Sequence, residues 1–102
     1  MDIDSIRQMV QNRDFIATKH VAARMAQRQV SEEQIITAIM NGRIIEERPK
    51  QKPYPKCLIA GNVERKIAGV SFIMPLYIAC ALGDTLYLLS TYWERPRDWY
   101  RS

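Results

Sequence analysis

Residues 18–28 read Thr18-Lys19-His20-Val21-Ala22-Ala23-Arg24-Met25-Ala26-Gln27-Arg28. The spacing predicts a helix with His20, Arg24 and Arg28 on one face, because side chains four residues apart point the same way. A neighbouring face can pack on a core and consists of Val21, Ala22, Met25 and Ala26. Thr18 precedes the helix and can accept a hydrogen bond from the backbone N–H of Val21. The segment therefore offers one face to a core and a polar face to solvent or a ligand.

The next helix has the clearest start signal in the chain. Ser31 and Gln34 have the spacing of a capping box. Glu32 and Glu33 occupy the first turn, where the helix dipole favours acidic side chains. We expect this helix to end at Asn41-Gly42 with left-handed geometry. Because only a short link joins the two helices, they should pack on one another as a helical hairpin.

The apolar spacing changes along the rest of the chain. Residues 3–12 have helical spacing behind Asp2, and Phe15-Ile16 looks like an anchor that leads into the central helix. Beyond residue 42 the spacing indicates strands. The expected strands are residues 43–47, 57–61, 75–82 and 85–92. Residues 62–66 predict a turn or loop, and residues 67–74 fit either a strand or a buried connection.

The last two strands are joined at Gly83-Asp84, which is a two-residue hairpin signal. In that register Leu82 faces Thr85, and Tyr77 and Tyr92 lie diagonally on one face of the sheet. These elements predict an α+β fold, with N-terminal helices (a helical hairpin) packed on one antiparallel sheet of about four strands. At 102 residues the chain should form a single domain, residues 1–102.

The charge of the chain is unevenly distributed. Residues 1–47 hold six Lys or Arg and seven Asp or Glu, whereas residues 48–102 hold nine and four. A basic excess confined to the second half favours a polyanion or an acidic partner. Proteins that bind neither also carry weak positive charge, so both interpretations stay open.

Other features of the sequence exclude several classes of protein. The start is acidic with no apolar segment behind it, which argues against a signal peptide, and no apolar run is long enough for a membrane span. Cys57 and Cys80 lie in expected strands, so we expect reduced core thiols in a cytoplasmic protein. Two cysteines and one histidine far apart do not form a metal-site pattern, so we expect no metal and no cofactor.

A basic, proline-rich segment spans residues 48–56 and predicts a loop. The side chains that suit phosphate contacts and base stacking are Lys50, Lys52, Tyr54 and Lys56. A solvated connector explains the same composition. Arg65 and Lys66 form a second basic segment that could carry an RNA backbone. The arginines and aromatic residues of 94–101 fit either a nucleic-acid-contacting tail or a cover in which Trp99 docks on the sheet.

Four motifs together resemble a known family. The leading motif of the bacterial domain-of-unknown-function family 4258 resembles His20-x-x-x-Arg24-Met25-x-x-Arg28-x-Val30-Ser31. Its strand motifs resemble, in the same order, Leu58-Ile59-Ala60-Gly61, Pro75-Leu76-Tyr77-Ile78 and Ser90-Thr91-Tyr92. This resemblance, over roughly residues 15–96, implies a helical hairpin on an antiparallel sheet. It also implies a relation to the compact ribonuclease toxins of the RelE, ParE and MqsR kind, with a small antitoxin protein as the candidate partner.

The toxin resemblance implies a metal-independent endoribonuclease with RNA as its substrate. His20 lies in the first turn of its helix, where the dipole opposes a protonated ring, and is the candidate general base. Arg24 and Arg28 would hold the phosphate, because guanidinium groups bind it in bidentate geometry. Tyr92 would act as an acid or orienting group, and Tyr77 is a secondary, substrate-binding candidate.

Two departures from the family favour other functions. The family's strand histidine is Tyr77 here, and residues 62–74 are longer than its usual connection. The alternative function is a non-catalytic module that binds nucleic acid or protein through the same basic face. In that alternative, the polar side chains of the central helix pin it to the sheet. A third candidate is a ParE-like inhibitor of a DNA enzyme, which shares the fold but needs no nuclease residues.

Overall fold

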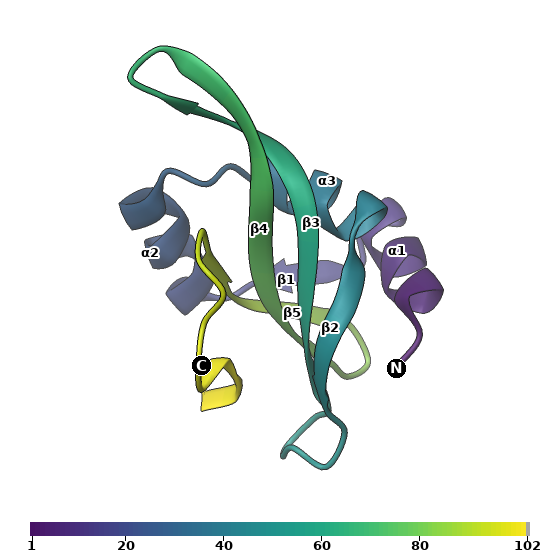
Figure 1. Ribbon diagram of the computed structural model, residues 1–102. Helices are drawn as coiled ribbons and strands as arrows, with labels where there is room; N and C mark the ends of the chain where they lie inside the picture. Colours follow the sequence, from purple (N-terminus) through teal and green to yellow (C-terminus); the bar gives the residue numbers. More distant parts are fainter. Residues whose placement is uncertain (102) are drawn as a thin grey trace.

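The computed structural model describes residues 1–101, which form helices packed on a mixed β-sheet (Figure 1). The helices are α1 (Ile3–Gln11), α2 (Lys19–Arg28), α3 (Glu32–Asn41) and the short 3₁₀ helix η1 (Trp99–Arg101). The strands are β1 (Phe15–Ala17), β2 (Arg43–Arg48), β3 (Lys56–Ile67), β4 (Val70–Leu82) and β5 (Leu86–Tyr92). Their order in the sheet is β1-β5-β4-β3-β2. The α+β class is therefore confirmed.

Local signals placed the helix starts correctly. The side chain of Asp2 accepts a hydrogen bond from the backbone N–H of Asp4 at the start of α1. Thr18 Oγ1 accepts one from the N–H of Val21 at 3.1 Å. Ser31 and Gln34 form the predicted capping box. Each start depends on residues two or three positions apart, so the sequence alone could specify it.

The predicted end of α3 was correct in position and wrong in geometry. Gly42 has φ −94° and ψ −166°, which is extended backbone rather than the left-handed conformation. A Cβ at Gly42 would lie 2.3 Å from the carbonyl oxygen of Ala38 and 2.4 Å from that of Ala60. Glycine is required here because the end of α3 closely approaches β3, and not because the turn is left-handed.

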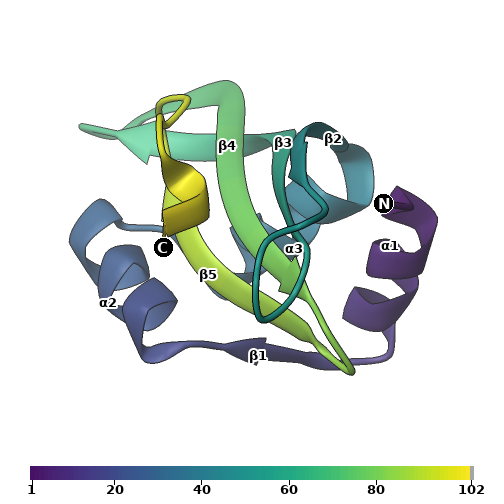
Figure 2. The same ribbon diagram turned by 90° about the horizontal axis from the view of Figure 1, so that it is seen from below.

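The expected helical hairpin was wrong. Helix α2 packs on β5, whereas α3 packs on β3 and β4. In Figure 2, α1 and α2 lie on opposite sides of the molecule and β1 runs between them. Both ends of α2 are fixed to the sheet side, since Thr18 Oγ1 donates to the carbonyl of Leu88 and the indole of Trp93 donates to the carbonyl of Arg28. These contacts bind α2 to β5 and the residue that follows it, rather than to α3.

The sheet has five strands in the described residues and is mixed, so the prediction of about four antiparallel strands was wrong. The extra strand is β1, which pairs in parallel with β5 from Phe15 opposite Leu86 to Ala17 opposite Leu88. The sequence suggested only an anchor at Phe15-Ile16. A three-residue strand has too little periodicity to be recognised, and it forms because the outer edge of β5 supplies its hydrogen-bond partners.

Residues 62–74 form most of a long hairpin, so the expected loop at 62–66 was wrong. Strand β3 continues to Ile67 and turns at Ala68-Gly69, where both residues have positive φ (52° and 78°). Such a turn matches the twist of a two-residue hairpin. Strand β2 pairs with β3 only as far as Ala60, and β5 pairs with β4 only as far as Tyr77. Beyond these residues the two strands project alone as a hairpin arm, residues 61–76 (Figure 1).

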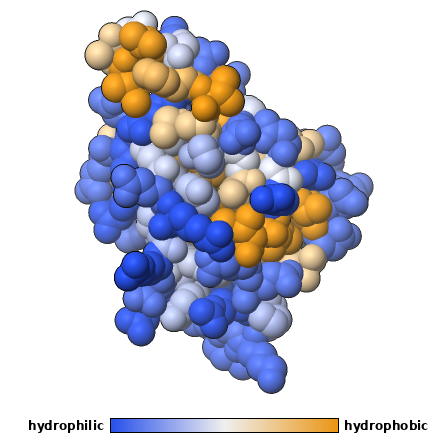
Figure 3. All heavy atoms as spheres, in the orientation of Figure 1, coloured by the Kyte–Doolittle hydropathy of each residue, from blue (hydrophilic) through white to orange (hydrophobic). Residues whose placement is uncertain are grey.

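The tip of the hairpin arm is apolar and exposed. Its side chains, with their exposed fractions, are Ile67 (45%), Val70 (53%), Phe72 (47%) and Ile73 (72%). Figure 3 shows this hydrophobic patch at the end of the arm. Mostly hydrophilic residues lie between it and the other hydrophobic region on that face.

The hairpin between β4 and β5 has a different register from the one predicted. Leu82 pairs with Leu86, so three residues occupy the turn instead of two. Thr85 lies in the turn, where its carbonyl accepts from the backbone N–H of Gly83 at 3.0 Å and its hydroxyl donates to the carboxylate of Asp14 at 2.6 Å. An irregularity between Ala79 and Cys80 shifts the register again. As a result Tyr77 lies directly opposite Tyr92. The prediction that they share one face of the sheet was correct, and the prediction that they lie diagonally was wrong.

The sheet is covered on both faces. The helices cover one face over the main core, and the C-terminal tail covers part of the other, with Trp99 packed on Leu58 and Ala79. Of the two interpretations of residues 94–101, the structure therefore shows the one in which Trp99 docks on the sheet. Cys57 and Cys80 are free, buried and directly opposite each other, as predicted for core thiols. A hydrogen bond with Cys57, together with burial, raises the pKa of the Cys80 thiol.

Candidate functional site

A hollow of about 470 Å³ lies at the end of β5, where α2, the hairpin arm and the start of the tail meet. It combines cationic and aromatic side chains and is lined by Arg28, Arg65, Tyr92, Trp93, Glu94, Arg95 and Pro96. We call it the arginine–aromatic hollow. Its walls come from segments far apart in the sequence, so the complete set exists only in the folded chain.

Arg28 and Tyr92 form the first cation–aromatic pair of the hollow. The guanidinium carbon of Arg28 lies 4.8 Å from the centre of the Tyr92 ring. Arg28 also donates a hydrogen bond to the backbone carbonyl of Thr91. Both side chains are half-buried. This arrangement holds a guanidinium plane in a fixed orientation while leaving the pair reachable from solvent.

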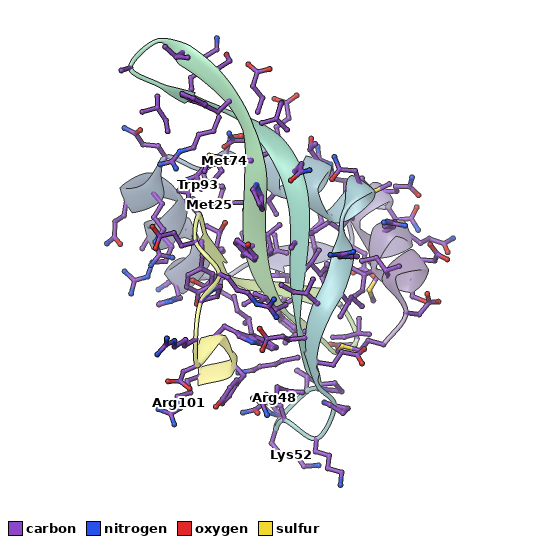
Figure 4. All side chains as sticks on the ribbon, in the orientation of Figure 1. Met25, Arg48, Lys52, Met74, Trp93 and Arg101 are labelled. Carbon is purple, nitrogen blue, oxygen red and sulfur yellow. The ribbon has the colours of Figure 1, made fainter. Side chains whose placement is uncertain are left out.

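Arg65 and Trp93 form the second pair. The guanidinium carbon of Arg65 lies 4.2 Å from the centre of the Trp93 ring, and Arg65 approaches the sulfur of Met74 at 3.9 Å. Trp93 Nε1 donates to the carbonyl of Arg28 at 2.8 Å. Figure 4 shows Trp93 and Met74 together where the hairpin arm leaves the sheet. Trp93 therefore connects the arm to the C-terminal end of α2.

Arg95 extends the cationic surface across the sheet. It donates to the carboxylate of Glu46 at 3.0 and 3.2 Å. The indole of Trp99 donates to the same carboxylate at 3.0 Å. The hydrogen bond from Trp99, then those from Arg95, hold the pKa of Glu46 below its ordinary value. Arg95 also lines a second hollow of about 580 Å³ that includes Arg43 and Tyr77.

The structure brings together two of the four residues proposed for catalysis. Arg28 and Tyr92 are in contact, and Tyr77 lies directly across the sheet from Tyr92. His20 is exposed in the first turn of α2 and lines neither hollow. Eight residues of helix place it roughly 12 Å from Arg28 along the axis. Arg24 lies between them and donates to the side chain of Gln27 at 2.7 Å.

The residues of the basic loop lie elsewhere. Lys50 and Lys52 are exposed, and Figure 4 shows Lys52 at the opposite end of the molecule from Trp93. The ring of Tyr54 stacks on Tyr87, with centres 5.5 Å apart and planes 13° apart. Lys56 is buried and donates to the carbonyl of Tyr100 at 2.7 Å. Two of the four side chains therefore make internal contacts.

Sequence reasoning named Arg65 but missed its partner. Trp93 follows the last strand and carried no motif, and Arg65 was expected in a loop rather than on a strand. Residues 63–67 read Val63-Glu64-Arg65-Lys66-Ile67, and the three successive charged residues break the alternation that a half-buried strand shows. The remaining signal was that Val63 and Ile67 lie two positions on either side of Arg65, so that all three would share one face of a strand. Lys66 is exposed and lines a neighbouring groove between the arm and the link from α2 to α3.

Residues 1–101 contain no group of three or more His, Cys, Asp or Glu side chains that could hold a metal ion. None of the helices in this part of the chain combines the length and apolar character needed to cross a membrane.

Comparison with known protein families places the segment from α2 to β3 in a described family. A family model described as a domain of unknown function (DUF4258) matches residues 17–70, more than half of the chain. The match runs from the last residue of β1 to the first residue of β4, so it includes Arg28 and Arg65 but not Tyr92 or Trp93. No curated protein and no solved structure matches the chain.

Proposed function

The chain belongs to the DUF4258 family of domains of unknown function, and from its own residues we propose that it binds single-stranded RNA in the arginine–aromatic hollow. One observation carries this proposal: two guanidinium–aromatic pairs, Arg28 with Tyr92 and Arg65 with Trp93, line the same hollow. Unpaired bases stack on aromatic rings and on guanidinium planes, while the same guanidinium groups bind phosphate.

The charge around the hollow supports an anionic ligand. Its lining includes Arg28, Arg65 and Arg95 but only one acidic residue, Glu94. Arg95 is partly neutralised by Glu46. Arg28 and Arg65 have aromatic, carbonyl and sulfur partners, and neither forms an ion pair with a carboxylate of residues 1–101. A hollow of this volume has room for a base and its phosphate, and bases that stack on aromatic side chains are those of single-stranded RNA.

The test is fluorescence anisotropy with a labelled single-stranded RNA, with the DNA of the same sequence and an RNA duplex as competitors. Arg65→Gln should weaken RNA binding about tenfold, because it removes one phosphate contact and one stacking partner. Lys52→Gln removes the same charge at the opposite end of the molecule and is the matched control. The proposal fails if both variants lose affinity equally, or if affinity does not fall with increasing salt.

A second candidate function is RNA cleavage by a RelE-like toxin. Under this proposal the protein acts in the cytoplasm and is paired with a small antitoxin protein. The contact between Arg28 and Tyr92 favours cleavage, because an arginine that holds the phosphate then lies beside a phenol. In this reaction a base takes the 2′-OH proton, the oxygen attacks the adjacent phosphorus, and the P–O5′ bond breaks. Tyr92 would protonate the leaving oxygen. His20, the base expected from the sequence, lies roughly two turns of α2 from Arg28, too far to reach the 2′-OH beside that phosphate, so solvent would take this proton.

Cleavage is tested by incubating RNA with the purified chain and analysing the ends of the products. The expected products carry a 2′,3′-cyclic phosphate, and Tyr92→Phe should abolish them, whereas His20→Ala should not. Induced expression should arrest growth, with relief by Tyr92→Phe. Intact RNA with wild-type protein that nevertheless binds RNA would exclude the second candidate and leave the first in place.

A further inference from the structure

We propose that two copies of this chain pair through the free edge of β4 in the hairpin arm, around a two-fold axis at Phe72. The proposal rests on other observations than those for RNA binding, although Phe72 pairs across the arm with Arg65. It starts from the apolar tip, where four large side chains are about half exposed or more. Contiguous apolar patches of a few hundred Å² on a small domain commonly mark an interaction surface.

The two edges of the arm differ in composition. The β3 edge carries Glu64, Arg65 and Lys66, and charged side chains on an edge oppose pairing with another strand. The β4 edge reads Val70-Ser71-Phe72-Ile73-Met74, which has no charge and no proline. Pro75 follows and ends the segment that could pair, because it has no backbone N–H. Only the β4 edge is therefore suited to a further strand.

The register of the arm sets which backbone groups are available on that edge. Val70 pairs with Ile67 across the two-residue turn and forms a hydrogen-bonded pair with it. Hydrogen-bonded and non-hydrogen-bonded pairs then alternate along the arm. The backbone N–H and C=O groups of Ser71 and Ile73 consequently point away from β3, towards the side where β5 no longer pairs.

An antiparallel second copy satisfies these groups symmetrically. With Phe72 opposite Phe72, Ser71 of each copy lies opposite Ile73 of the other and the two residues exchange backbone hydrogen bonds. Val70 lies opposite Met74, so Val70, Phe72 and Met74 of both copies share one face. The segment is thus self-complementary in its hydrogen bonds and its apolar side chains, which favours a second copy over an unrelated strand.

The arm projects beyond the rest of the molecule (Figure 1). A two-fold axis perpendicular to the arm would keep both apolar faces on one side and place the two bodies at opposite ends of a four-stranded sheet. The segment that pairs has only five residues in each copy, Val70 to Met74, which is too short to bury the roughly 1,200 Å² of a stable standard interface. The pair should therefore be weak and reversible, with a dissociation constant on the order of micromolar.

The test is sedimentation velocity of the full chain over a wide range of concentration. Wild type should shift from monomer to dimer, and Phe72→Glu, which sets like charges face to face on the axis, should stay monomeric. Ile16→Glu is the matched control, because Ile16 is equally exposed (48% against 47%) on the edge strand β1. It should dimerise like wild type.

A second variant tests the register directly. Phe72→Cys places two thiols at a non-hydrogen-bonded antiparallel pair, within the distance that a disulfide spans, so mild oxidation should yield a covalent dimer. Ile16→Cys should not. Wild type that stays monomeric at every concentration, association that survives Phe72→Glu, equal loss in Ile16→Glu, or growth beyond a dimer would each overturn the proposal.

Discussion

Arg65 lies with its guanidinium 4.2 Å from the centre of the Trp93 ring, and this contact ties the hairpin arm to the end of β5. Trp93 in turn donates its indole N–H to the last residue of α2, Arg28. The side chain of Trp93, directly after β5, therefore contacts both the hairpin arm and α2, which are distant from it in the sequence. The same side chain lines the arginine–aromatic hollow, so the stability of the fold and the shape of the site should change together when it is altered.

Trp93→Phe should lower the free energy of unfolding by about 1–2 kcal/mol, because it removes the hydrogen bond to Arg28 and weakens the cation–π contact with Arg65. Urea denaturation monitored by circular dichroism measures this. Amide hydrogen exchange should become faster in the arm as well. A change below roughly 0.3 kcal/mol, within ordinary surface variation, would mean that the contact does not hold the arm in solution.

Tyr92→Ala should weaken single-stranded RNA binding about tenfold or more, whereas Tyr92→Phe should bind like wild type. Stacking requires the ring and not the hydroxyl, and it contributes roughly 1–3 kcal/mol per base. Anisotropy titrations of both variants measure the difference. If Tyr92→Phe loses as much affinity as Tyr92→Ala, the hydroxyl and not the ring makes the contact. If Tyr92→Phe binds RNA but no longer cleaves it, the two proposed functions are separated.

Glu46→Gln should destabilise the protein at neutral pH and have little effect in acid. The pKa of Glu46 is lowered in the folded state, first by the hydrogen bond from Trp99 and then by Arg95. A lowered pKa contributes stability above the ordinary value of 4.5 and loses it as the pH falls through the lower folded value. The expected loss at neutral pH is about 1 kcal/mol, since the carboxylate is partly exposed.

Urea denaturation of wild type and Glu46→Gln at pH values on both sides of this range measures the effect. The two stability curves should converge as the carboxylate is protonated. A constant difference between them at every pH would show that the glutamine acts through packing and not through charge.

Gly42→Ala should destabilise the protein by more than about 2 kcal/mol, because the new methyl group overlaps the carbonyls of Ala38 and Ala60. Gly69→Ala is the matched control at the tip of the arm. Its Cβ would contact nothing within 4 Å, so only the positive φ of 78° opposes it, at a cost of about 1 kcal/mol. Thermal or urea unfolding of both variants measures the difference, and equal effects would contradict the close approach at Gly42.

The candidate site was only partly predictable. The helical spacing correctly put Arg28 on a polar face, and Tyr77 and Tyr92 were correctly placed on one face of a sheet. Which residues would meet there could not be deduced. His20 shares a helix with Arg28 and lies two turns away, whereas Arg65 and Trp93 share no motif and are in contact.

The sequence by itself determined the helix starts, the α+β class and the existence of most strands. These features depend on residues within a few positions of one another, where capping bonds and apolar periodicity act before any long-range contact forms. Tertiary structure decided the pairing of β1 with β5, the register between β4 and β5, the length of the arm and the composition of the hollow. Each depends on a choice among distant partners of similar local preference, and that choice is settled only when the chain closes on itself and buries its core.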